Sequence, residues 1–82
     1  MEAIDVANVA IKEFFNCLGN KGIDPQKVKE EFLVNVLGFI VKKVFTLISE
    51  QPNLPEQILI AKAKLIGIEE GVAFMSFLAA QN

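Results

Sequence analysis

Apolar residues recur at helical spacing along almost the whole chain, in three stretches separated by short polar segments. The first stretch has one apolar stripe and an opposite polar face, as expected of an amphipathic helix. Its stripe consists of Ile4, Ala7, Ile11, Phe14 and Leu18. Gly19 and Asn20 follow it, and both suit a left-handed helix cap. This pattern predicts a one-sided helix over about residues 3–18.

The second stretch lies between two proline signals. Asp24 followed by Pro25 is a helix start, because Asp can accept from free backbone N–H groups and Pro loses no hydrogen bond at the first helical position. Pro52 disfavours helix at Gln51 and ends the stretch. We therefore predict a second helix over about residues 25–50.

The third stretch has the heptad spacing of a bundle or coiled-coil seam. Its apolar positions alternate at intervals of three and four residues: Ile58, Ala61, Leu65, Ile68, Val72, Met75 and Ala79. Asn53 with Glu56 matches a capping box, and Leu54 competes as the cap if Pro55 is the first helical residue. The prediction is a helix over about residues 54–80.

A row of small residues, Ala63, Gly67 and Gly71, runs along the same predicted helix at four-residue intervals. Such a row permits close helix approach, as in helix dimers in membranes. Gly67 and Gly71 lower helix propensity by about 1 kcal/mol each. Two interpretations stay open, namely a contact between copies and a tight crossing or kink within one copy.

The predicted second helix has more apolar surface than one bundle needs. Its apolar residues cover roughly two thirds of the circumference, whereas a surface helix needs a stripe of a little over 100°. One seam is Leu33, Leu37, Ile40, Val44 and Leu47, and another is Val34, Val41, Phe45 and Ile48. Phe74, Phe77 and Leu78 add apolar surface to the third helix away from its heptad seam. We take Val34, Val41, Phe45, Ile48, Phe74, Phe77 and Leu78 as the candidate interface, with Gly67 and Gly71 as close-packing glycines.

Chain length turns this surplus into a prediction about association. The 82 residues form one expected domain, 1–82, and 52% of them are hydrophobic. A helix over residues 25–50 would be about 39 Å long, whereas a compact globule of this size is about 30 Å across. The predicted fold is therefore all-α, an antiparallel three-helix bundle completed by homodimerisation or a higher homo-oligomer.

Candidate chemistry is sparse. The chain has no His, Arg, Trp or Tyr, and its net charge is −2. Cys17 has no His to activate it, so we expect a small hydrophobe and no metal site. Glu69 and Glu70 point about 100° apart on a helix and cannot form a dyad. Glu70 is either a partly buried carboxylate or a rim carboxylate that faces solvent or pairs with a Lys. The segment GNKG at 19–22 lacks the context of a phosphate loop. We expect no catalytic residues, no enzyme activity and no cofactor.

The partner classes follow from the same composition. A slightly acidic chain without Arg, Tyr or Trp is a poor match for nucleic acid. The segment FLVNVLGFIV at 32–41 is too short to span a bilayer and is bracketed by charges. We expect no transmembrane segment and a cytoplasmic location.

The main hypothesis is a helical regulator, adaptor or assembly factor that works by self-association and can engage a protein partner. The alternative is that the seven Phe residues line a cavity for a lipid or acyl chain.

Overall fold

Three helices make up the fold in this computed structural model, which describes residues 1–81. They are α1 (Ala3–Asn20), α2 (Glu30–Glu50) and α3 (Glu56–Ala80), with a short 3-10 turn at Pro25–Lys27 between the first two. Within the described residues there is no strand. The predicted all-α, three-helix architecture is confirmed. The molecule is elongated, with extents of 43 × 21 × 18 Å.

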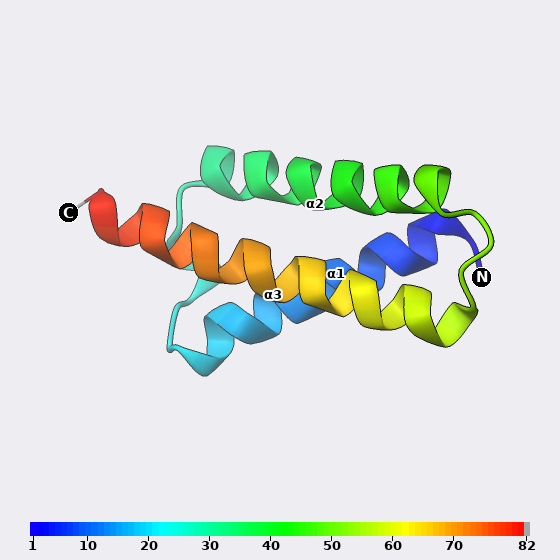
Figure 1. Cartoon of the computed structure of the whole chain (residues 1–82). Coiled ribbons are helices and arrows are strands. Elements are labelled where there is room, and N and C mark those ends of the chain that lie inside the picture. Colours follow the sequence, from blue (N-terminus) through cyan, green and yellow to red (C-terminus); the bar gives the residue numbers. More distant parts are fainter. Residues whose placement is uncertain (82) are drawn as a thin grey trace.

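Helix α1 crosses α3 at its middle, and both run in the same direction, while α2 runs antiparallel to them (Figure 1). The crossing uses the row of small residues. A Cβ built on Gly67 would overlap the carbonyl oxygen of Ala10 and lie 3.0 Å from Glu13 Cβ. A Cβ on Gly71 would lie 2.8 Å from Cys17 Sγ. Of the two interpretations of this row, the crossing within one copy is the one observed.

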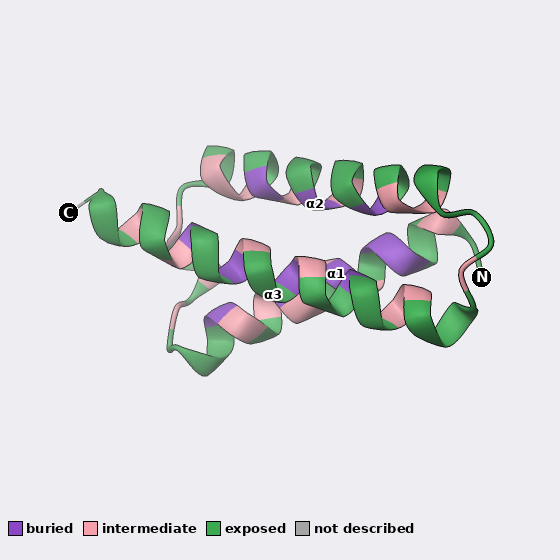
Figure 2. Ribbon diagram, in the orientation of Figure 1, coloured by how far each residue is buried: buried purple, intermediate pink, exposed green. Residues whose placement is uncertain are grey.

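The core lies where α1 meets the other two helices. It is wholly apolar among the described residues: Val6, Ala7, Ala10, Phe14, Leu18, Val36, Ile40, Val44, Ala63 and Phe74. Phe14 and Leu18 have no exposed surface, and burying side chains of this size contributes about 1.5–3 kcal/mol each. Figure 2 shows these buried positions facing inward between otherwise exposed helices.

The predicted seams of α1 and α3 are partly wrong. Ile4 is exposed and Ile11 is half-buried, while Val6 and Ala10 lie in the core instead. The heptad seam of α3 is exposed except at Met75, which is half-buried, and the side with Ala63, Gly67 and Gly71 is buried instead. The physical reason is that the glycines bring α3 closest to α1 on their own side, which rotates the heptad positions outward.

The helix ends also differ from the predictions in places. Gly22, not Gly19 or Asn20, adopts the left-handed conformation with φ of 73°. The Ile23 N–H donates to the Leu18 carbonyl at 3.0 Å and the Gly22 N–H to the Gly19 carbonyl at 3.0 Å, which is a Schellman cap. The GNKG segment is therefore the end of a helix and a turn.

The predicted start of the second helix is five residues too early. Asp24 does cap, since its Oδ1 accepts from the Gln26 N–H at 2.9 Å. The turn it caps is the 3-10 turn, and Val28 is extended before α2 begins at Glu30. Val28 packs against the core, so burial of this side chain accompanies the break. For α3 the predicted cap is also wrong, because Pro55 precedes the first helical residue and no side chain caps it.

The crossing predicts opposite effects of two glycine substitutions. Gly67→Ala adds about 1 kcal/mol of helix propensity, but its Cβ meets the backbone of α1, and overpacking costs about 1–3 kcal/mol or more. Because the clash is with backbone, we expect a cost at the upper end, about 3 kcal/mol, and hence a net loss of about 2 kcal/mol in the free energy of unfolding. Gly38→Ala is the control, because no atom lies within 4 Å of a Cβ there. It should stabilise by about 0.5–1 kcal/mol. Urea unfolding followed by circular dichroism measures both, and a Gly67→Ala chain as stable as the parent would contradict the close crossing.

Candidate functional site

A series of phenylalanine rings connects the three helices. Phe14 of α1 contacts Phe74 of α3 edge to face, with ring centroids 5.5 Å apart. Phe74 stacks near Phe77 at 6.1 Å, and Phe77 meets Phe32 of α2 at 4.9 Å. These edge and offset contacts are the favoured geometries for aromatic pairs. The rings thus join the α1–α3 crossing to α2, which otherwise packs less tightly.

An apolar groove lies over this series, between α2 and α3. We call it the aromatic groove; its walls include Phe32, Phe39 and Asn35 from α2 and Ala73, Phe77 and Glu70 from α3. It encloses about 330 Å³, at the lower end of the usual range of about 300–1,000 Å³ for ligand pockets. The geometry can accommodate part of an aliphatic chain or an apolar side chain from another protein.

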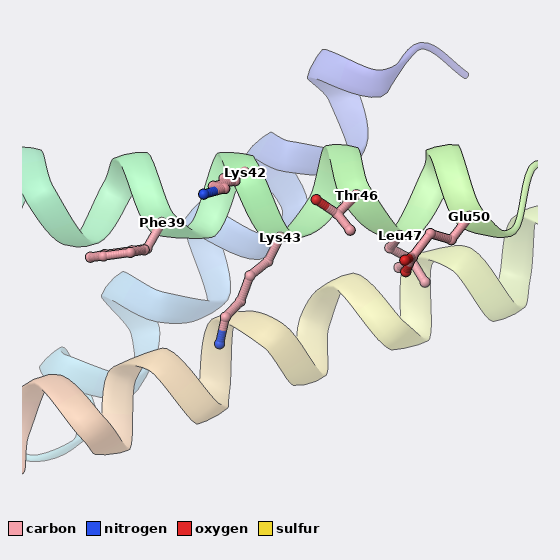
Figure 3. A pocket seen from close by; sticks show the side chains of 6 residues that line it. All are labelled: Phe39, Lys42, Lys43, Thr46, Leu47 and Glu50. Carbon is pink, nitrogen blue, oxygen red and sulfur yellow. The ribbon is translucent and has the colours of Figure 1, made fainter.

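A second hollow of about 370 Å³ continues along α2 and shares Phe39 with the aromatic groove. Figure 3 shows Lys43 extending from α2 toward α3 within it. The Lys43 Nζ donates to Glu70 Oε2 at 3.0 Å. This ion pair stands between the two hollows, with Lys43 lining one and Glu70 the other. Glu70 pairs with a Lys, as one interpretation had it, and its side chain is also partly buried, with 16% exposed.

Polar side chains lie outside the core among the described residues. These residues include no group of three or more His, Cys, Asp or Glu placed to hold a metal ion. They also include no buried polar or charged side chain and no unsatisfied buried polar atom. Cys17 is half-buried and lies at the crossing against Gly71. The features that solvent reaches are an apolar groove and exposed apolar side chains on the helices.

The candidate interface residues fall into three different settings. Val34 is 60% exposed and Phe45 is 46% exposed, while Val41 and Ile48 beside them are half-buried. We call these four residues the outer face of α2. Phe77 is exposed at the aromatic groove and Leu78 is half-buried. Phe74 is 5% exposed and belongs to the core, so its assignment to an interface between copies was wrong; its ring is already covered by Phe14.

One apolar surface was missed as a candidate site, namely the heptad seam of α3. Leu65 is 55% exposed and Val72 is 54% exposed, and Ile58 and Ile68 are exposed as well. We call the seven heptad positions the outer stripe of α3. The spacing was visible in the sequence, but α3 is apolar on two sides, and spacing does not tell which side faces inward. The small-residue row on the other side was the signal that could have decided it.

Helix α2 is also long and apolar enough to cross a membrane by length and composition alone. An 18-residue window within its 21 residues has a mean hydropathy of 1.8. Lys42 and Lys43 lie past the midpoint of this helix. A Lys near the centre of a spanning helix costs about 2.5–3.5 kcal/mol on the insertion scale. The absence of a spanning segment stays a prediction, favoured by these two charges.

The Lys43–Glu70 pair should contribute little to stability. Its side chains are 54% and 16% exposed, and exposed pairs contribute about 0–1 kcal/mol. A double-mutant cycle with Lys43→Gln and Glu70→Gln should give a coupling of about 0.2–0.5 kcal/mol at low salt. The coupling should vanish near 1 M salt, where the Debye length is about 3 Å. Zero coupling at low salt would contradict a net contribution of this pair to stability.

Comparisons of the chain with known protein families, with characterised proteins and with solved structures found no match. Functional inference therefore rests on the surfaces and grooves described above.

Proposed function

We propose that this chain is a non-enzymatic helical interaction protein that acts through self-association, as a small regulator, adaptor or assembly factor. We also propose that a protein partner can add to or replace the contact between copies. The observation that carries this proposal is the number of large apolar side chains left exposed on a chain of 82 residues. Exposed apolar patches of more than a few hundred Å² commonly mark interaction sites.

Small size supports the same proposal. A chain of this length buries only about 60–65% of its unfolded surface, so a monomer is marginal. Helix α2 has core on one side only, since Val36, Ile40 and Val44 are its buried residues. A two-fold contact between copies would cover the outer face of α2, and two-fold dimers are the commonest soluble oligomers.

The slightly acidic charge and the absence of Arg favour a protein partner over nucleic acid, and we expect a cytoplasmic location.

The outer face of α2 gives a direct test. Val34→Lys places a charge on this face without touching the core, because the side chain is largely exposed in one copy. We expect it to lower the mass of the assembly, whereas Asn35→Lys, one position along the same helix, should leave the mass unchanged. Light scattering across a concentration series measures the mass against the 9.0 kDa of a single chain. A soluble wild-type monomer at all concentrations would remove the support for self-association.

The aromatic groove favours a second candidate function, the binding of an apolar ligand such as a lipid or acyl chain. Its aromatic walls suit an aliphatic chain, and the lysines of the neighbouring hollow suit a negatively charged head group. Lys43 already has a carboxylate partner, so Lys42 is the cation left to meet such a group in this hollow.

Filling the groove tests this alternative. Ala73→Leu adds three carbons to an exposed wall of the aromatic groove and should abolish ligand retention. Ala80→Leu is the matched control, since Ala80 is also exposed on α3 but lies outside the groove. Native mass spectrometry of purified protein should show bound lipid in the parent and in Ala80→Leu. Its absence from the parent, both as purified and after incubation with a fatty acid, would exclude the ligand hypothesis.

A further inference from the structure

The outer stripe of α3 has the residue pattern of a two-stranded coiled coil but no partner helix among residues 1–81. Its positions follow heptad spacing without interruption over three heptads, from Ile58 to Ala79. At about 100° per residue, the stripe is centred roughly 130° away from the row of Ala63, Gly67 and Gly71 that contacts α1. Its first five positions, from Ile58 to Val72, are exposed and do not pack against the core, whereas Met75 near its end is half-buried against the core.

We propose that the outer stripe of α3 pairs with the same stripe of a second copy, forming a coiled coil between two α3 helices. This inference rests on the proposed self-association and names a contact of its own, separate from the outer face of α2. A second copy is the fitting occupant because a heptad stripe is complementary to itself under two-fold symmetry. Ile58, Leu65 and Val72 would occupy the first core position, with Ala61, Ile68 and Met75 at the second.

The charges beside the stripe fit this occupant. The positions that flank a coiled-coil core, and form its salt bridges, carry Lys62, Lys64 and Glu69 as their charged residues. None of the three has an opposite charge three or four residues away on its own helix, where pairing would occur. All three are exposed, and the one ion pair among the described residues is Lys43–Glu70.

Opposite charges of the two copies come together whether the two α3 helices pair parallel or antiparallel. In a parallel pair, Glu69 of one copy lies near Lys64 of the other. The reason is that a flanking residue of one helix meets the flanking residue on the facing side that lies five positions further along the partner helix. In an antiparallel pair, like flanking positions meet, and the register that joins Leu65 to Ile68 of the other copy brings Glu69 near Lys62. In that register the small Ala61 lies opposite the larger Val72, so the layers of the coiled-coil core have similar side-chain volumes.

The size of the contact sets its expected strength. The stripe is about 32 Å long and a helix about 10 Å wide, so the pair covers roughly 600–700 Å² in total. Stable interfaces bury about 1,200–2,000 Å². The contact between two stripes is therefore weak by itself, and it must be measured from micromolar to several hundred micromolar protein.

The test uses the Val34→Lys chain, in which the outer face of α2 carries a charge. Sedimentation equilibrium should show that this chain still self-associates. Adding Leu65→Lys should weaken the remaining association at least about tenfold, since a charge then replaces a core position. Lys is as good a helix former as Leu, so the circular dichroism should not change. Ile4→Lys is the matched control, an equally exposed apolar residue on α1, and should leave the association intact.

The outcomes separate this inference from the proposed function. If wild type associates but the Val34→Lys chain is monomeric at several hundred micromolar, the pairing of α3 is overturned and self-association stands. The pairing of α3 is likewise overturned if Leu65→Lys has no effect on the remaining association. If wild type is monomeric throughout, both are overturned.

Charge reversal in the same background tests the flanking pairs. Glu69→Lys should weaken the association about fivefold. Rescue by Lys64→Glu supports a parallel pair, and rescue by Lys62→Glu supports an antiparallel one. Failure of both reversals to rescue would overturn the pairing of stripes.

Discussion

The close approach of α1 and α3 at Gly67 and Gly71 is the contact on which the rest of the structure depends. Without side chains at these two positions, α3 comes within contact distance of the α1 backbone at Ala10 and of Cys17. The approach fixes the rotation of α3 about its own axis. Once Ala63, Gly67 and Gly71 face α1, Phe74 points into the core and the heptad positions other than Met75 face solvent. Interiors are close-packed, so even one methyl group at this crossing would force the helices apart.

Helix α2 completes the molecule by a different kind of contact. It buries Val36, Ile40 and Val44, and it meets α3 through the edge-to-face pair of Phe32 and Phe77 and through the Lys43–Glu70 ion pair. Aromatic side chains hold helices farther apart than glycines do, and the aromatic groove lies at this wider contact. The tight crossing and the wider contact together produce an elongated molecule whose outer faces carry much of its exposed apolar surface. Three helices of this length leave part of that surface uncovered, and this exposure is the basis of the proposal that the chain acts by association.

Much of the fold could be predicted from the residues because the signals were local. Helical spacing and the proline-containing boundaries located three helices, and the end of α3 at Ala80 agrees with the prediction. The errors arose where packing overrode a local signal. Asp24 and Pro25 do start a helical turn, but burial of Val28 interrupts it before α2 begins. Of the candidate site, Val34 and Phe45 lie on the surface as an interface requires, whereas Phe74 is part of the core.

The sequence by itself determined the number of helices, their approximate limits, the apolar excess and the absence of His, Arg, Trp and Tyr. These properties depend on residue type and on neighbours within a few positions, so periodicity and composition are sufficient to read them. Only the tertiary structure decided which of the two apolar sides of α3 faces inward. Both sides are apolar enough to be buried, and hydrophobicity does not distinguish them. Shape distinguishes them, because glycine allows a close backbone contact that Leu65 and Val72 would prevent, and that contact exists only when α1 is in place.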